Sequence, residues 1–254
     1  EGNAKFLSTQ VKKSLKRSNK IITISQHAKE DIENFYKISG NRVVVATPAT
    51  DPKLFYRRSA HEIKKVKSKY GISGQYILAL SNLEPRKNLD SLVEAYCRLP
   101  KDLLKDISLL LVGVSGWKTD LLFQKIVDKV DQGFKIIRPT SYVKDQDKPA
   151  IISGAKMLVY PSHYEGFGMP PLEALACGVP VITANNSSLP EVVGKAGKMI
   201  PSDNIDLLTS SMIDYLQNIE AVTQDTIISG PERARSFSWV KSAQAFLDVA
   251  KELE

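Results

Sequence analysis

Two acidic residues, Glu165 and Glu173, are eight positions apart in a stretch rich in glycine, proline and apolar residues (residues 160–192, YPSHYEGFGMPPLEALACGVPVITANNSSLPEV). Gly166 and Gly168 lack side chains, so a ligand can come close to the backbone N–H groups of this segment. Carboxylates beside such a segment can accept hydrogen bonds from hydroxyl groups, as on a sugar. Spacing alone leaves a second interpretation open, in which Glu165 is a solvated loop acid and Glu173 only complements a helix dipole.

A short helix is expected to position the second acid. Pro170 and Pro171 suit a first helical turn, where a missing N–H costs nothing, and Gly178 suits a left-handed exit. The unpaired N–H groups and the dipole of a helix N-terminus favour an anion such as phosphate. The pattern therefore predicts a helix over residues 171–176 with Glu173 in its first turn.

A basic turn is the second candidate group. The segment SNLEPRKNL follows a predicted strand (residues 76–80) and contains Arg86 and Lys87. In a doubly wound sheet, ligands bind outside the carboxyl ends of the strands. The guanidinium fork of Arg86 and the charge of Lys87 could stabilise a diphosphate there. The alternative is a turn of solvated cations.

The elements around these groups alternate between strands and helices from about residue 57. Continuous apolar strands such as SLLLVG are typical of a parallel sheet covered on both faces. The predicted strands are residues 76–80, 107–112, 134–138, 157–160, 180–183 and 198–200, after two earlier ones at 20–25 and 42–47. The predicted helices are residues 1–20, 26–36, 89–98, 119–132, 148–153, 171–176, 205–218 and the tail. We therefore expect an α/β fold with a doubly wound sheet.

Composition is that of an ordinary globular protein. Of the 254 residues, 43% are apolar and 25% are charged, and no apolar run reaches the length of a membrane span. The net charge of +7 concentrates in the first twenty residues and in residues 57–69. Such clusters are usually solvated faces, although anionic lipid headgroups or a phosphorylated acceptor remain open. Nucleic acid is disfavoured, because no aromatic residues interleave with the basic runs.

Cys97 and Cys177 occur in apolar helical contexts without a C-x-x-C motif, which predicts reduced thiols in a cytoplasmic protein. No cluster of His, Cys or Asp suggests a metal site. His163, two residues before Glu165, is interpreted as polar surface rather than as a general base.

The segments EGFG, ALACGVPVI and LPEV resemble the donor-site signature of retaining GT-B glycosyltransferases of family 4 (group 1 type), in particular bacterial polysaccharide mannosyltransferases. The segments TISQHAKEDIENFYKISGNRVVVATPATDPKLF and GPERARSFSW extend the resemblance to nearly the whole chain. Such enzymes have two Rossmann-like domains, with the acceptor mostly on the first and the donor on the second. The resemblance implies a C-terminal donor domain together with only part of the N-terminal domain.

The implied domains are residues 1–56 as the last part of the acceptor-side domain, residues 57–235 as the donor domain, and residues 236–254 as a helix that crosses back to the first domain. The chain should therefore pair with a missing N-terminal half or with itself.

The resemblance also implies roles for individual residues. Glu165 would contact the donor sugar, Glu173 the ribose, and Arg86 with Lys87 the diphosphate, so Glu165, Arg86 and Lys87 form the expected catalytic set. Tyr142 or Val143 would contact the base, or else anchor a strand end. The remaining expected donor-binding residues are Gly166, Phe167, Gly168, Met169 and Ser187.

The expected activity is transfer of a sugar from a nucleotide-diphospho sugar, with GDP-mannose preferred, to a saccharide or lipid-linked acceptor. The resemblance implies action without metal or cofactor. The expected location is the cytoplasm, with peripheral contact at the inner face of the membrane left open. Two other interpretations are a non-catalytic nucleotide-sugar-binding subunit and a sugar phosphorylase. Intact Glu165, Glu173, Arg86 and Lys87 argue against the first, and the lack of a pyridoxal-phosphate lysine context argues against the second.

Overall fold

The structure, a computed structural model, describes residues 2–139 and 141–253, with side chains described from residue 9 onward. The chain divides into two compact units. The small unit contains Glu1–Ala49 and Phe237–Glu254, and the large unit contains Thr50–Ser236. The boundaries expected from the sequence are 56/57 and 235/236, whereas the compact units divide at 49/50 and 236/237. The assignment of the units to acceptor and donor sides stays a prediction.

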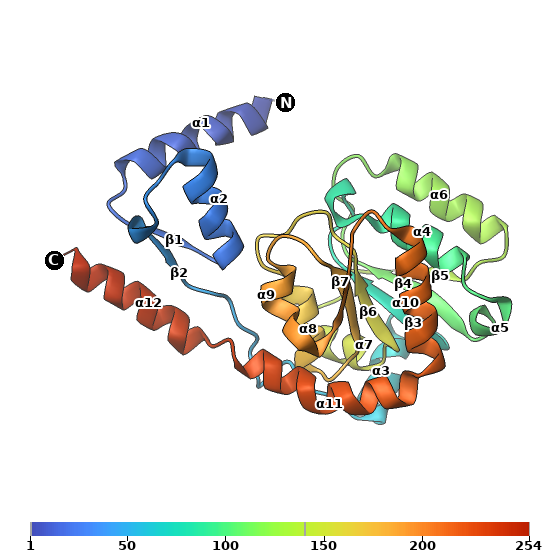
Figure 1. The fold of residues 1–254 in the computed structure, drawn as a ribbon. Helices are drawn as coiled ribbons and strands as arrows, with labels where there is room; N and C mark the ends of the chain where they lie inside the picture. Colours follow the sequence, from blue (N-terminus) through green and yellow to red (C-terminus); the bar gives the residue numbers. More distant parts are fainter. Residues whose placement is uncertain (1, 140, 254) are drawn as a thin grey trace. The chain divides into compact units, whose positions relative to one another are not determined.

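The large unit is built on one parallel sheet of six strands, in the order β5-β4-β3-β6-β7-β8 (Figure 1). Its strands are β3 (Gln75–Leu80), β4 (Ile107–Val112), β5 (Ile136–Ile137), β6 (Met157–Tyr160), β7 (Val181–Ala184) and β8 (Lys198–Ile200). The chain first builds outward from β3 through β4 to β5, and then returns to place β6 on the other side of β3. The sheet therefore has a switch point between β3 and β6, where ligands bind in open α/β sheets.

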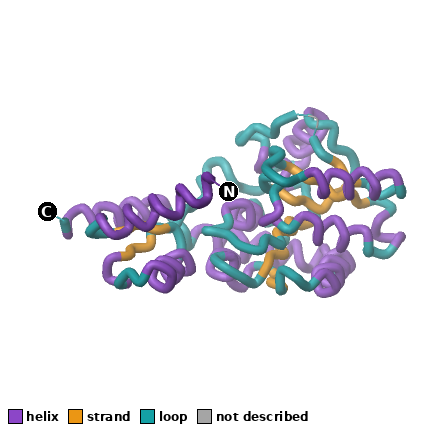
Figure 2. The backbone as a smooth tube through the Cα atoms, turned by 90° about the horizontal axis from the view of Figure 1, so that it is seen from above, coloured by secondary structure: helices purple, strands orange, loops and turns teal. Residues whose placement is uncertain are grey.

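Helices cover both faces of the sheet, as the continuous apolar strands require (Figure 2). One layer consists of α4 (Leu89–Cys97), α6 (Asp120–Asp131) and α10 (Ile205–Gln217), with the short α5 (Lys101–Leu104) beside β4. The opposite side carries α3 (Ala60–Lys69), α7 (Lys148–Ser153), α8 (Met169–Ala176), α9 (Leu189–Val193) and α11 (Ile219–Arg235). Strand residues Ile77, Leu109 and Met157 are fully buried in the core against the first layer. The predicted α/β fold with a parallel sheet is confirmed.

Several predicted boundaries are wrong. The strand expected over residues 134–138 pairs with β4 only at Ile136–Ile137, because it is an edge strand of which only these two residues join the ladder. Four helices, α3, α5, α9 and α11, do not correspond to any predicted helix. A Ser59 capping box starts α3, and α11 runs through Pro231, a residue that normally interrupts a helix.

The small unit combines both ends of the described chain. It contains α1 (Gly2–Arg17), β1 (Ile21–Thr23), α2 (Gln26–Tyr36), β2 (Val43–Val45) and α12 (Trp239–Glu252). The strands β1 and β2 pair in parallel, three residues each. Arg42 donates to the carbonyl of Leu15 at the end of α1, and the hydroxyl of Ser242 in α12 donates to the carbonyl of Thr47. These contacts join α1 and α12 to the residues that flank β2.

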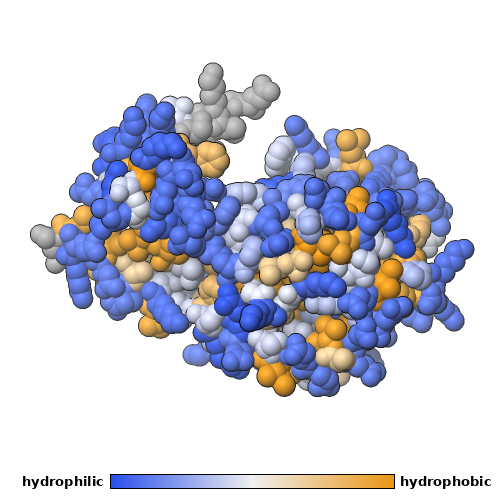
Figure 3. Space-filling view, viewed as in Figure 1, coloured by the Kyte–Doolittle hydropathy of each residue, from blue (hydrophilic) through white to orange (hydrophobic). Residues whose placement is uncertain are grey.

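Apolar side chains on α12 are exposed, among them Val240 (78% exposed), Phe246 and Leu247. In Figure 3 apolar patches interrupt the largely hydrophilic surface of the small unit. Within the described residues, no helix combines the length and hydropathy that a membrane span requires.

Candidate functional site

The loops after β3 and β6 lie side by side at the switch point of the sheet. After β3, the chain forms a short 3-10 helix, η2 (Pro85–Lys87), and Asn88 adopts a left-handed backbone conformation (φ 54°). The Asn88 amide donates to the carbonyls of Pro161 (3.1 Å) and Ser202 (2.7 Å). The backbone N–H of His163 donates to the carbonyl of Arg86 at 2.9 Å. These bonds fix the basic turn against the glycine-containing loop.

The carboxylate of Glu165 lies between the two cations of the basic turn. Lys87 Nζ donates to Glu165 Oε1 at 2.6 Å, and Arg86 Nη1 donates to Glu165 Oε2 at 2.8 Å. Arg86 Nη2 donates to Glu84 Oε1 at 2.7 Å, and Lys87 Nζ donates to the Tyr160 hydroxyl at 2.9 Å. We call these five residues the ion-pair cluster. It joins the two predicted candidate groups, since Glu165 lies 78 positions after Lys87 and 79 after Arg86 in the sequence.

Burial makes this cluster more than a surface ion pair. The side chains of Glu165 and Lys87 are 8% and 10% exposed, whereas Arg86 is 39% exposed and reaches solvent. Burial alone would raise the pKa of Glu165, but the hydrogen bonds and charges of Lys87 and Arg86 outweigh it and lower that pKa. Glu165 is therefore ionised at neutral pH and fixed in place.

The loop after β7 supports Glu165 from the other side. The Glu165 backbone N–H donates to Ser187 Oγ at 2.9 Å. The Ser188 hydroxyl is fully buried, and its oxygen, which carries a single proton, is within hydrogen-bonding distance of the carbonyls of Glu165 (2.9 Å) and Phe167 (2.6 Å). Ser187 thus lies at the predicted site, where it contacts the backbone of Glu165. Phe167 is buried.

Helix α8 starts where the loop ends. Gly168 has φ 125°, and a Cβ there would lie 2.9 Å from Leu189 Cδ2, so this position requires glycine. Met169 begins α8, two positions earlier than predicted, with proline in the first turn as expected. Glu173 consequently lies beyond the first turn of α8, and its predicted place in that turn is wrong.

Glu173 lies in a different electrostatic environment from Glu165. Burial raises its pKa to about 7, with Lys148 lowering it and Asp145 raising it further. Among the described contacts, none joins Glu173 to the ion-pair cluster. The structure thus places one ionised and one readily protonated carboxylate around the loop and the first two turns of α8.

The two residues expected to contact the nucleotide base differ in their exposure to solvent. Tyr142 is 66% exposed and free to contact a ligand, whereas Val143 is 5% exposed and packs in the interior. His163 is exposed, with Nδ1 3.4 Å from the Ser202 hydroxyl. Trp117 is 57% exposed.

Sequence reasoning missed Tyr160, Glu84 and Asn88. Tyr160 ends an otherwise aliphatic strand, MLVY, and a polar side chain in such a strand was the available signal. Glu84 and Asn88 flank the basic turn, but their contacts depend on the position of the β6 loop.

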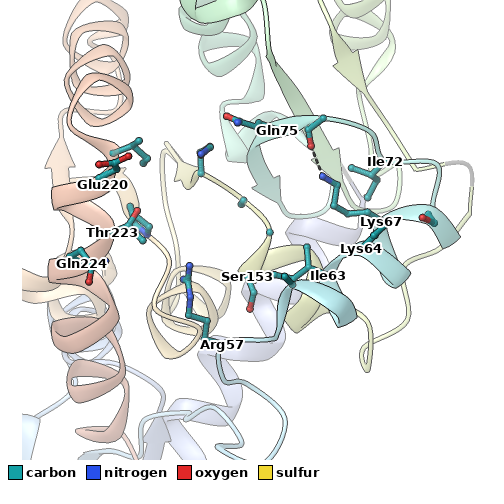
Figure 4. Close-up of a pocket in the computed structure, with 18 of the residues that line it drawn as sticks. Arg57, Ile63, Lys64, Lys67, Ile72, Gln75, Ser153, Glu220, Thr223 and Gln224 are labelled. Carbon is teal, nitrogen blue, oxygen red and sulfur yellow. Dashed lines mark hydrogen bonds between the residues drawn. The ribbon is translucent and has the colours of Figure 1, made fainter.

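A separate pocket of about 840 Å³ lies at the opposite edge of the sheet, near the first residue of β3 (Figure 4). Arg57, Lys64, Lys67 and Lys156 line it together with the first turns of α11. Lys67 donates to the carbonyl of Gly74, and Arg57 donates to that of Gly178 at 3.0 Å. Two of these cations therefore hold loop carbonyls, and the pocket is not part of the site at the carboxyl edge.

Among the described residues, metal-ligating side chains do not cluster at the ion-pair cluster or at the pocket on the opposite edge. In the described parts of the chain, no group of three or more His, Cys, Asp and Glu side chains could hold a metal ion. Action without metal or cofactor stays a prediction.

Residues 62–225 match the family Glycosyl transferases group 1, so the chain belongs to that family. It is similar to O-antigen chain mannosyltransferase B of Escherichia coli, with 34% identity over 236 residues. That match covers 92% of this chain and 61% of the relative. The Serotype-specific mannosyltransferase WbdA of Escherichia coli is 29% identical over 237 residues, which are 91% of this chain and 28% of the relative. The chain thus spans about six tenths of the first relative.

The fold is that of the GT-B glycosyltransferases. The structure of HepE from Anabaena in complex with UDP and glucose superposes with a TM-score of 0.84 at 17% identity. The superposition covers 97% of this chain and 66% of that chain. At this identity the likeness shows the architecture alone.

Proposed function

We propose that the protein is a retaining glycosyltransferase that transfers mannose from GDP-mannose to a saccharide or lipid-linked acceptor in polysaccharide synthesis. The ion-pair cluster carries this proposal, because it combines two cations for a diphosphate with a carboxylate for sugar hydroxyls at the switch point. The names of the two relatives support mannose as the sugar and a polysaccharide as the product. Contact of the basic helix α1, with exposed Lys12, Lys13, Lys16 and Arg17, with the inner face of a membrane belongs to the same proposal.

Each group then has a defined task. Arg86 and Lys87 bind the diphosphate and stabilise the charge that it gains on leaving. Glu165 accepts hydrogen bonds from the sugar, and the amide groups at the start of α8 face the phosphates. Glu173 accepts from the ribose hydroxyls.

The reaction is a substitution at the anomeric carbon from the face on which the diphosphate leaves. A bond forms from the acceptor oxygen to the anomeric carbon while the bond to the phosphate oxygen breaks and its electron pair leaves with the diphosphate. The acceptor's hydroxyl proton passes to the departing phosphate oxygen. No protein nucleophile takes part, so a second carboxylate at glycosidase spacing is not required.

Calorimetry on the chain with GDP-mannose, UDP-glucose and UDP-N-acetylglucosamine tests this proposal. We expect GDP-mannose to bind most tightly. Lys87→Ala should weaken binding of the preferred nucleotide by about 1.5–3 kcal/mol, the value of a hydrogen bond to a charged group. The matched control is Lys156→Ala at the pocket on the opposite edge, which should leave binding unchanged. Unchanged affinity in Lys87→Ala would contradict the assignment of the turn to the diphosphate.

A further inference from the structure

A buried tyrosine contacts the cation that the proposed function places on the diphosphate. Tyr160 is the last residue of β6 and is 3% exposed. Its hydroxyl accepts from Lys87 Nζ at 2.9 Å, and the centre of its ring lies 5.2 Å from the same nitrogen. The lysine therefore has both a hydrogen-bond acceptor and an aromatic face as partners.

The position of Tyr160 is fixed independently of the basic turn. β6 pairs with β3 on one side and with β7 on the other, with Tyr160 in register with Thr183. Lys87 instead belongs to a 3-10 turn, and its long side chain has more rotational freedom than a strand-end aromatic ring. A rigid acceptor can thus set the direction of a flexible ammonium group.

The chemistry of the phenol differs from that of the neighbouring carboxylate. Burial, followed by the negative charge of Glu165, raises the pKa of Tyr160 far above its ordinary value, so the phenol is neutral. Its contact directs Lys87 without cancelling the positive charge, whereas pairing with Glu165 does cancel it. An ammonium group has three N–H donors. The bond to Tyr160 uses one of them, and the others are available to the diphosphate once it displaces Glu165.

We infer that Tyr160 is a positioning residue for Lys87, whose hydroxyl keeps the ammonium group aimed at the diphosphate of the donor. This inference rests on the proposed function, since that function places Lys87 on the diphosphate. Tyr160 itself is buried and need not touch the donor.

A double-mutant cycle on the whole 254-residue chain tests the inference, with calorimetry of whichever of GDP and UDP binds more tightly. Tyr160→Phe keeps the ring and should weaken binding about three- to tenfold, the effect of one net hydrogen bond. In a Lys87→Ala background the same change should have no further effect, because the group that it positions is gone. Binding of the parent nucleoside, followed by saturation transfer, should not change.

The matched control is Tyr76→Phe. Tyr76 is fully buried in the neighbouring strand β3, and its hydroxyl donates to the carbonyl of Ile151 at 2.7 Å, away from Lys87. This variant loses a comparable buried hydroxyl bond and should bind the nucleotide as the wild type does, so it separates positioning from a general loss of stability.

The outcomes distinguish a failure of the proposed function of the basic turn from a failure of the inference about Tyr160. If Lys87→Ala leaves diphosphate binding unchanged, the proposed function of the turn fails. If Lys87→Ala weakens binding but Tyr160→Phe does not, or weakens it equally in both backgrounds, Tyr160 does not act through Lys87 and the inference is overturned. A folding defect in Tyr160→Phe would lower nucleoside affinity as well, and that result also counts against positioning.

Discussion

The formal charges of the ion-pair cluster cancel before any donor arrives. Arg86 and Lys87 are both paired with Glu165, and Arg86 is also paired with Glu84. A diphosphate that approaches these cations must therefore compete with a carboxylate already bound to both. Glu165 occupies the cations in the free protein and is available to hydroxyl groups once phosphate takes its place.

Glu165→Gln should consequently change the affinity for the bare nucleotide and the affinity for the nucleotide sugar to different extents. We expect bare GDP or UDP to bind about two- to tenfold more tightly, because phosphate no longer displaces a charge-assisted bond. The nucleotide sugar should gain less, since it loses a charged acceptor for its hydroxyls. Calorimetry with both ligands measures the ratio.

Glu84→Gln is the control for this substitution, because Glu84 pairs with Arg86 alone. Its effect should be smaller and the same for both ligands. Weaker binding of the bare nucleotide to Glu165→Gln would show that the carboxylate supports the phosphate site rather than competing for it.

Glu173 should make nucleotide affinity depend on pH. Its folded-state pKa of about 7 lies above the ordinary value of 4.5, because burial opposes the charge. The folded protein therefore binds the proton more tightly than the unfolded chain, and this contribution to stability, complete below pH 4.5, is lost as the pH rises through 7. An ionised carboxylate is the better acceptor for ribose hydroxyls, so affinity should rise between pH 6 and 8.

Titration calorimetry of the wild type and Glu173→Gln across this range measures the effect. The terminal phosphate of a nucleotide titrates near about pH 6 as well, so the informative quantity is the difference between the two proteins. Parallel curves would mean that Glu173 does not contact the ribose.

Much of this site could be predicted from the sequence, but the contact of Glu165 with Arg86 and Lys87 could not. Glu165 and the basic turn were each identified from residue type and from their place after a strand. Their pairing requires β3 and β6 to be neighbours, although β4 and β5 intervene in sequence. Local patterns cannot specify that order, and for the same reason the contact of Tyr160 with Lys87 was missed.

Among the elements, α11 matters most to the site, because it packs against α8, the helix that carries Glu173. Gly230 is buried in α11, and a Cβ there would lie 2.6 Å from the carbonyl oxygen of Leu175. The sequence GP at positions 230 and 231 predicts a break, yet here it gives close helix packing. Glycine permits the approach, and tertiary contacts override the propensity of Pro231.

Gly230→Ala should therefore destabilise the protein, although alanine favours a helix by about 1 kcal/mol over glycine. Forcing a methyl group against the α8 backbone should lower the free energy of unfolding by about 1–3 kcal/mol and weaken nucleotide binding through a displaced Glu173. Thermal and denaturant unfolding measure the first effect. Ile228→Ala, at a 73% exposed position of α11, is the control and should change stability by less than about 0.5 kcal/mol. A more stable Gly230→Ala protein would contradict the packing argument.

The strands were predicted better than the helices. β4 and β6 match their predicted ranges because each is a continuous apolar run, buried on both faces. The helix α3 was missed because its sequence, AHEIKKVKSK, is mostly charged. Its capping box is a local signal that could have revealed it.

At the scale of the whole molecule, the small unit is thinly built. β1 and β2 form a pair of three-residue strands, and an isolated two-stranded sheet is marginal in water. The chain covers 61% of the first relative, and the apolar side chains of α12 are exposed. These observations fit a unit that is completed by further polypeptide.

We therefore expect the 254-residue chain to bind the nucleotide sugar without transferring the sugar to an acceptor. Transfer requires the acceptor hydroxyl to be oriented at the anomeric carbon, and the family resemblance assigns acceptor binding mostly to the first domain. A turnover assay and a mass measurement in solution decide the matter. Full turnover by a 28.1 kDa monomer would contradict this expectation.

The small unit is built from two segments that lie on either side of the large unit in sequence, and this arrangement limits the order in which the two units can fold during synthesis. The helix α12 follows the large unit in sequence, yet it packs with residues that precede that unit, so all of the large unit is translated between them. At about 5–20 residues per second, the first 49 residues wait about 10–40 s for that helix. The large unit, whose chain is contiguous, can fold during this interval. Residues 1–49 therefore lack their α12 partner until the whole large unit has been translated.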